Sequence, residues 1–346
     1  MSQFNCHARM TGFHKDEIDL GTDEWKDLAA KRDTNRNRLK SGLKRDGEPS
    51  PVGCNTQGSY AMDIMTQHAA KDYDIDDGVY FTKDSLVGPR GGDKSPADAK
   101  EMVRKALHDD KFTRPPEVRT NCVRVYYNEG FHVDIPVYRR TKNADGTYKY
   151  ELASTYWKAS DPLRVTRWFR DAVRRKSPNM VNGGQLRRIT RLIKGFARSR
   201  ESWRGQIATG FMIAKLVVDH FYSSDGRDDI SLRETMRAIH FQLKYISLQV
   251  RHPVLDEMLT RDAQDSRTAL LRDKLEWALE QLEVLDNWDC TEAQAHKAWD
   301  KVFATTYFTD GAKVTKSITS AAIIGSRSFE EAGSAPVDPR GSRRYG

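Results

Sequence analysis

The character of the sequence changes at Asp161-Pro162, and this change constrains the fold more than any other feature. Before it, strand-like alternation is interspersed with helical segments, whereas after it nearly every segment has the apolar spacing of a helix. We therefore predict an α+β protein with two lobes, in which a mixed sheet with helices precedes a helical bundle. The predicted units are a mixed lobe over 1–160, a helical lobe over 161–316 and a flexible tail over 317–346.

Start signals and periodicity predict the elements of each lobe. In the mixed lobe, Ser95-Pro96 has the form of a helix N-cap followed by a first-turn proline. One predicted helix there begins at Thr22 and a second spans 96–108. The predicted strands span 72–81, 121–127 and 131–139. In the helical lobe, helices are predicted over 163–175, 186–199, 206–222, 231–247, 267–286 and 291–304, two of them with the capping-box pairs Ser231–Glu234 and Thr291–Gln294.

Positive charge is concentrated in one internal segment. The chain carries a formal net charge of +8, but residues 164–204 alone hold 11 Arg and 2 Lys against two acids. Such a concentration predicts a polyanionic partner, either nucleotide phosphates or nucleic acid. On the predicted helix 186–199, Arg187, Arg191, Lys194 and Arg198 form one stripe opposite an apolar stripe. This basic stripe is either a solvated surface or the lining of a cleft in which Arg191 and Lys194 bind a triphosphate.

Three aspartates lie on predicted strands. Asp74 and Asp76 alternate with Ile75, and Asp134 lies between Val133 and Ile135. Alternation places Asp74 and Asp76 on one face of a strand, and carboxylates that project from adjacent strands repel one another unless cations lie between them. Hard oxygen ligands of this kind suit Mg²⁺, with Mn²⁺ as the alternative ion. The pattern predicts two-metal phosphoryl transfer, although a DxD on a strand is also common on a solvated face.

Gly58-Ser59 precedes these aspartates and opens a predicted helix. A glycine allows close approach of the backbone to phosphate, and the N–H groups and Ser hydroxyl at a helix start bind phosphate oxygens. We therefore predict that this pair, with the adjoining Gln57, binds the nucleotide.

These residues carry a family resemblance. The order of QGSYAMDIMTQHAAKDYDIDDGVYF, HVDIPVY, SDPLRVTRWF and HPVLDE resembles the bacterial CD-NTase family of cyclic-oligonucleotide synthases, within the polymerase β-like superfamily. The chain is most similar to the cyclic GMP-AMP synthase group of that family. The resemblance covers roughly residues 20 to 310 and implies a nucleotidyltransferase lobe joined to a helical lobe, with the active site in the cleft between them.

The resemblance also implies roles for individual residues. Asp74, Asp76 and Asp134 would be the metal-binding catalytic carboxylates, and Gly58 and Ser59 would bind the triphosphate. Lys194 occupies a position like that of a phosphate-contacting residue of the family. The implied enzyme uses nucleoside triphosphates, ATP and GTP above all, and its cyclic product switches on a separate effector in anti-phage defence. Because no zinc-binding insertion is evident, activation by double-stranded DNA is not expected.

Two other functions are compatible with the same residues. One is a polymerase β-like transferase that acts on RNA or on a small acceptor. The other is a non-catalytic nucleic-acid-binding protein that uses the Arg-rich segment, in which case the aspartates are incidental. Incubation with NTPs and Mg²⁺ without an acceptor distinguishes them.

Both ends of the chain carry expectations of their own. No apolar run approaches the roughly 20 residues of a membrane span, and the N-terminus lacks the apolar stretch of a secretion signal, so we expect a cytoplasmic protein. The tail ends in Gly346. A glycine carboxylate can enter a narrow active site, and relatives are encoded beside E1/E2-like partners, so Gly346 is a candidate conjugation point; the alternative is an ordinary disordered end.

Overall fold

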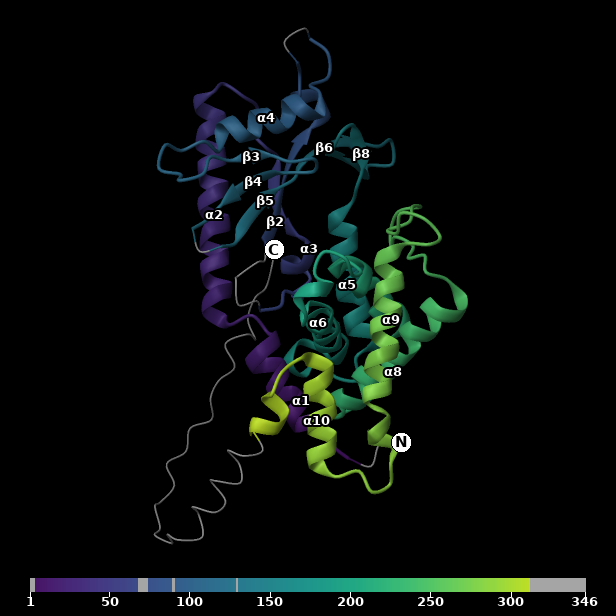
Figure 1. The fold of residues 1–346 in the computed structure, drawn as a ribbon. Coiled ribbons are helices and arrows are strands. Elements are labelled where there is room, and N and C mark those ends of the chain that lie inside the picture. The colour runs from purple at the N-terminus through teal and green to yellow at the C-terminus, as the bar shows by residue number, and fades with distance from the viewer. Residues whose placement is uncertain (1–3, 68–73, 89–90, 129, 312–346) are drawn as a thin grey trace, which may run out of the picture.

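The computed structural model describes residues 4–67, 74–88, 91–128 and 130–311, which form a sheet-containing lobe and a helical lobe (Figure 1). Asp74 is described by its backbone alone. None of the helices within these ranges is long and apolar enough to cross a membrane.

One mixed sheet forms the first lobe. Its order is β3-β4-β5-β2-β6-β7-β8, and β1 also pairs with β2. Strands β5 and β6 pair with β2 in parallel at the same offset, so they run as one line along β2 that is interrupted at Pro136. The strands are β1 (Gly53–Gln57), β2 (Asp74–Thr82), β3 (Glu117–Val118), β4 (Val123–Tyr126), β5 (His132–Ile135), β6 (Val137–Lys142), β7 (Tyr148–Ala153) and β8 (Trp157–Ala159).

Two helices cover one face of this sheet, α2 (Thr22–Arg45) and α4 (Pro96–Ala106). Apolar residues of both helices pack against Val79, Phe81 and other buried strand residues. The helices approach closely at Gly42, where a Cβ would lie 1.9 Å from the carbonyl oxygen of Ala106. The side chain of Ser95 accepts a hydrogen bond from Asp98 N and so caps α4, as predicted. The covered face is therefore mostly apolar, with the buried pair of Asp77 and Arg36 of α2 as a polar exception.

The helical lobe packs around a separate core in which Trp299, Phe169 and Phe196 are fully buried. Asp161, Thr209 and Asp265 cap α5, α7 and α9, and Thr291 with Gln294 forms the predicted capping box of α10. The helices are α1 (His7–Phe13), α5 (Pro162–Lys176), α6 (Gln185–Arg198), α7 (Gly210–His220), α8 (Asp228–Phe241), α9 (Ser266–Gln281) and α10 (Glu292–Phe303).

The α+β fold class is confirmed, and the structure corrects several predicted boundaries. The strand predicted over 131–139 is divided at Pro136, and β1, β7 and β8 were missed. Helix α8 begins at Asp228, so Ser231 and Glu234 lie inside it and do not form a capping box. The predicted unit 1–160 is also wrong at its start, because Cys6, Met10, Phe13 and Ile18 are buried in the core of the helical lobe.

Candidate active site

A row of polar side chains crosses the uncovered face of the sheet. Asp76 of β2 is the register partner of two residues, Asp134 on β5 and Gln57 on β1. Asp134 is in turn the register partner of Arg124 on β4. Register partners on neighbouring strands project from the same face, with the strands about 4.8 Å apart. Asp74 is the partner of His132 in the same parallel pair, but its side chain lies outside the description. The sheet therefore brings Asp76 and Asp134 together.

Asp134 is held by an arginine. Its side chain accepts two hydrogen bonds from Arg124, at 2.7 Å from Nε and 2.8 Å from Nη2, in the bidentate arrangement typical of Arg–carboxylate pairs. Burial raises the pKa of the neighbouring Cys122 thiol, and the negative charge of Asp134 raises it further. Arg124 thus places a positive charge directly beside this buried carboxylate.

Gly58 and Ser59 begin the short helix α3 (Gly58–Ala61) directly after β1. Gly58 has φ +64, in the left-handed region, and a Cβ at this position would lie 2.1 Å from Oδ2 of Asp76. Glycine is therefore required here both by the backbone conformation and by the space that the Asp76 carboxylate occupies. The turn therefore lies in contact with the Asp76 carboxylate.

The basic stripe of α6 contacts the segment that follows this turn. Four consecutive carbonyl oxygens, those of residues 61–64, each accept a hydrogen bond from a cationic side chain of α5 or α6. The donors, in the same order, are Arg170, Arg187, Arg191 and Lys194, and Arg198 donates to Oγ1 of Thr66 at 3.2 Å. The stripe is therefore neither a simple solvated surface nor only the lining of a cleft, because most of its side chains donate to the protein's own backbone. The carbonyl oxygens orient these cations, and Asp63 pairs in addition with Arg187 and Arg191.

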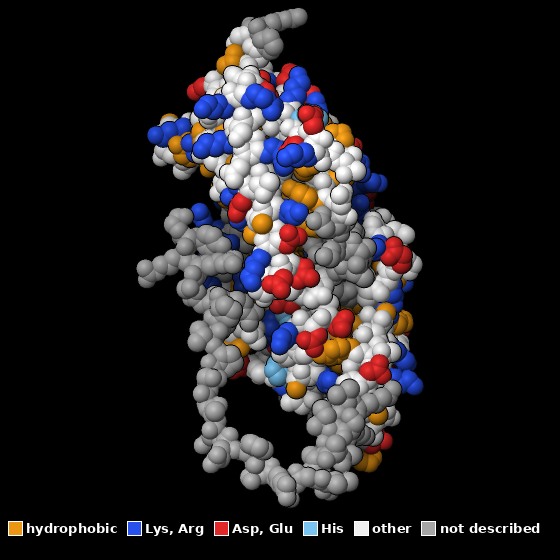
Figure 2. Space-filling model, turned by 90° about the vertical axis from the view of Figure 1, so that its left-hand side faces the viewer, with side chains coloured by type: hydrophobic (Ala, Val, Ile, Leu, Met, Phe, Trp, Pro, Cys, Tyr) orange, Lys and Arg blue, Asp and Glu red, His pale blue; other side chains and the backbone are white. Residues whose placement is uncertain are grey.

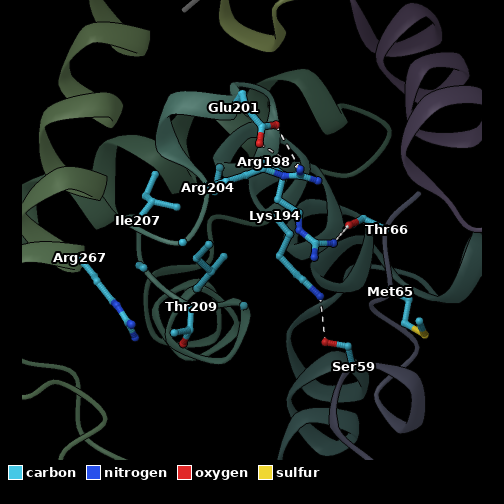
Figure 3. Close-up of a pocket in the computed structure, with 15 residues that line it drawn as sticks. Ser59, Met65, Thr66, Lys194, Arg198, Glu201, Arg204, Ile207, Thr209 and Arg267 are labelled. Atoms are coloured by element: carbon cyan, nitrogen blue, oxygen red, sulfur yellow. Dashed lines mark hydrogen bonds and ion pairs between the residues drawn. The ribbon is translucent and has the colours of Figure 1, made fainter. Parts of the chain in front are cut away.

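Lys194 connects the stripe to the turn. Its Nζ donates to Oγ of Ser59 at 3.0 Å, and the lysine is 6% exposed. Both residues line a cavity of about 620 Å³ (Figure 3). The cavity also holds Arg198, Arg204 and Arg267, whereas Glu201, which pairs with Arg204, is the one acid of its lining. An anionic ligand of the size of a nucleotide suits such a cavity.

The position of Arg191 does not fit the hypothesis that Arg191 and Lys194 together line a triphosphate-binding cleft. Its side chain is 5% exposed and forms ion pairs with Asp63 at 2.7 Å and with Asp19 at 3.1 Å. It is absent from the lining of the cavity that contains Lys194. Gln57 is likewise turned into the protein, where its Nε2 donates to the hydroxyl of Tyr138 at 3.0 Å. The geometry therefore groups Ser59 with Lys194 and separates both from Arg191.

Sequence reasoning missed Arg124, Asp63, Thr209 and Arg267. Arg124 alternates with Val123 and Val125, which signals a side chain on the uncovered face. Thr209 caps α7 and lines the cavity together with Arg267. On the face shown in Figure 2, Lys and Arg side chains are most frequent in the upper part, over the sheet-containing lobe.

The residues of the row fit a divalent cation in part. Asp76 and Asp134 offer the hard oxygen donors that Mg²⁺ prefers. Among the described residues no group of three or more His, Cys, Asp or Glu side chains could hold a metal ion, and the Asp74 side chain was not part of that set. Two donors are therefore in register, and the predicted third ligand, the carboxylate of Asp74, lies outside the described side chains.

The fold is shared with solved structures. Vibrio cholerae DncV cyclic AMP-GMP synthase in complex with nonhydrolyzable GTP matches with a TM-score of 0.68 and 17% identity, over 88% of this chain and 97% of that one. The same enzyme with the linear intermediate 5′ pppA(3′,5′)pG gives 0.67 and 17%, over 88% and 96%. Escherichia coli DncV in its 3′-deoxy GTP bound form gives 0.62 and 18%, over 84% and 93%.

A family model matches within the sheet-containing lobe. It is described as the nucleotidyltransferase domain of cyclic GMP-AMP synthase DncV-like proteins, and it covers residues 53–138. This segment contains the Gly58-Ser59 turn, both strands of the Asp76–Asp134 pair and Arg124. By this match, residues 53–138 are similar to a DncV-like nucleotidyltransferase domain, and the fold of the chain is similar to that of the DncV structures.

Proposed function

We propose that the chain joins nucleoside triphosphates into a cyclic oligonucleotide. One observation carries the proposal: Asp76 and Asp134 are register partners beside the Gly58-Ser59 turn, and this turn borders a cationic cavity through Ser59 and Lys194. Nucleotidyl transfer needs carboxylates at the reacting phosphate and cations at the leaving pyrophosphate. The turn adjoins both groups, the Asp76 carboxylate through Gly58 and the cationic cavity through Ser59.

Each residue has a separate task in this proposal. Ser59 and Lys194 bind the β- and γ-phosphates of the donor nucleotide, which orients its α-phosphate toward the carboxylates. Asp74, Asp76 and Asp134 would hold two Mg²⁺ ions, or Mn²⁺ in their place. The ions, when bound, lower the pKa of the attacking hydroxyl and neutralise the leaving pyrophosphate. Arg124 holds the Asp134 carboxylate in place through two hydrogen bonds.

We further propose a purine cyclic dinucleotide such as cyclic GMP-AMP as the product, made from ATP and GTP. This choice is supported by the description of the matching family and by the nucleotides in the names of the similar structures. A cytoplasmic enzyme of this kind would act in anti-phage defence (CBASS) through an effector that binds the product.

The test is incubation of the purified chain with the four NTPs and Mg²⁺ in the absence of any acceptor. We expect a product that resists phosphatase and whose mass, measured by mass spectrometry, equals that of a cyclic dinucleotide. A product that appears only when RNA or a small acceptor is added would indicate the alternative transferase. Absence of NTP turnover together with tight nucleic-acid binding would indicate the non-catalytic alternative.

We also propose that Gly346 is conjugated to targets by an E1/E2-like partner. The support is the sequence of the tail alone, since Gly346 lies outside the described residues. Co-expression with neighbouring genes should give conjugates of higher mass from the native chain and none from Gly346→Glu, because a terminal glutamate cannot enter the narrow site of such an enzyme. Conjugates that persist in the variant, or that never form, contradict the proposal.

A further inference from the structure

Asp63 closes the turn that carries Ser59, and it does so in an unfavourable backbone conformation. The N–H of Ile64 donates to the carbonyl of Ser59 at 2.9 Å, and the N–H of Asp63 donates to that of Tyr60 at 3.0 Å. These two bonds define a Schellman motif at the end of α3, with Asp63 at the left-handed position, φ +57. Glycine is the usual residue at this position because it avoids the steric cost of the left-handed conformation.

The side chain explains why an aspartate is found here. The Asp63 carboxylate accepts a hydrogen bond from Nη2 of Arg191 at 2.7 Å, and the Asp63 carbonyl accepts one from Nε of Arg191 at 3.0 Å. Arg191 is itself buried and contacts Asp19 on its other side. A glycine would satisfy the backbone, but it would leave Arg191 without this carboxylate. Asp63 therefore fastens the end of the turn to α6 by two bonds to a single guanidinium.

The next residue transmits this attachment to the cavity. The N–H of Ile64 bonds to the Ser59 carbonyl, and the Ile64 carbonyl accepts from Nζ of Lys194. The same Nζ donates to Oγ of Ser59. Lys194, Ser59 and Ile64 thus form a closed ring of hydrogen bonds, and the conformation of Asp63 sets the direction of the Ile64 peptide within it.

We propose that Asp63 is a positioning residue. Together with Arg191 it holds the turn so that Ser59 and Lys194 bind the same phosphate group. The inference rests on the proposed function, in which Ser59 and Lys194 bind the triphosphate. It assigns Arg191 an indirect role through Asp63, in place of direct contact with the nucleotide.

The experiment measures the Kd of a nonhydrolysable GTP analogue with Mg²⁺ for the full chain and its variants. Asp63→Gly keeps the left-handed turn but removes the carboxylate that Arg191 binds, and it should raise the Kd about tenfold, because a small displacement of positioning groups weakens the interactions that depend on them. Asp63→Asn tolerates the left-handed conformation and still accepts from Arg191, so its Kd should stay within about threefold of the native value. The Kd of guanosine, which lacks phosphates, should change in neither variant.

Two further variants complete the design. Ala304→Gly is the matched control, since Ala304 ends α10 in the same left-handed conformation (φ +54) at the other end of the chain's described residues, and its Kd should be native. Arg191→Lys keeps the positive charge but cannot bind the Asp63 carbonyl and carboxylate together, and it should weaken binding several-fold. This variant carries the test if Asp63→Gly does not fold, and melting temperatures identify that case.

A double variant separates the indirect role of Arg191 from a direct one. If Arg191 acts through Asp63, Asp63→Gly with Arg191→Gln should bind no more weakly than Asp63→Gly alone. Additive losses would mean that Arg191 contacts the triphosphate itself, and a native Kd for Asp63→Gly would mean that the turn needs no fastening; either result overturns the inference. Ser59→Ala identifies failure of the proposed function: if it leaves the Kd unchanged, the turn does not bind the triphosphate, whatever Asp63 does.

Discussion

At the scale of single residues, the two described aspartates of the row differ in what surrounds them. Asp134 is paired with Arg124, whereas Asp76 lies against Gly58, where no side chain can be accommodated. Substitution of each therefore tests a different property, although both lie on the same face of the sheet.

We expect Asp74→Asn combined with Asp76→Asn to abolish product formation, because two-metal transfer has no substitute for these anionic ligands. The melting temperature should change little. Asp134→Asn should also abolish turnover but should in addition lower the free energy of unfolding by about 1–3 kcal/mol, because the partly buried Arg124 loses its charged partner. The checks are the NTP assay and thermal unfolding. Near-normal turnover in the double variant contradicts the assigned mechanism.

His14 makes the stability of the chain dependent on pH. Burial, with the positive charges of Arg191 and Arg188 as further causes, lowers the pKa of His14 from 6.5 to about 3. Between these two values the unfolded chain binds a proton that the folded chain does not. The stabilisation is therefore complete above pH 6.5 and falls by up to about 1.4 kcal/mol per pH unit as the pH decreases. Denaturant unfolding from pH 7 to 4.5 should show a smaller decrease for His14→Gln than for the native chain; equal slopes would contradict this account.

At the scale of elements, helices with strong local signals could be predicted from the sequence, whereas strands with weak local signals could not. Helices α4, α5 and α10 were predicted almost to the residue because Ser95, Asp161 and Thr291 are N-cap residues with short-range partners. Strands β1 and β7 were missed because their residues alternate weakly, and they are defined by pairing with partners remote in sequence. The three aspartates and the Gly58-Ser59 turn could be predicted from short motifs. The attachment of Asp63 to Arg191 could not, since it joins residues 128 positions apart.

The crossing of α2 and α4 should be sensitive to a single methyl group. In Gly42→Ala the new Cβ would meet the backbone carbonyl of Ala106, which cannot rotate away as a flexible side chain can. Ala favours a helix interior over Gly by about 1 kcal/mol, but separation of two packed helices costs more, so we expect a net loss of about 1–2 kcal/mol. Urea unfolding measures it. Gly47→Ala is a useful contrast, because space is open there and the cost arises from its left-handed φ alone.

At the scale of the whole molecule, the N-terminal segment closes the helical lobe. Phe13 packs against Phe303 and Phe308 with ring centroids 4.7 and 5.0 Å apart, and His7 accepts a hydrogen bond from the backbone of Asp228. Removal of residues 1–18 should therefore lower the melting temperature by more than 10 °C or prevent folding, since several fully buried side chains are lost at about 1.5–3 kcal/mol each. Differential scanning calorimetry of the truncated chain is the measurement; an unchanged transition would contradict the assignment of this segment to the core.

This closure of the helical lobe by the N-terminal segment affects folding during synthesis. Helix α1 is synthesised about 300 residues before Phe308, so its apolar side chains lack part of their core until most of the chain has emerged. At about 5–20 residues per second, that interval lasts roughly 15–60 s. During this interval, Met10 and Phe13 are accessible to chaperones. Helix α6 can contact the turn of Ser59 only after residue 198 has been synthesised. The nascent chain therefore exposes the sheet with Asp76 and Asp134 long before α6 can contact the turn of Ser59.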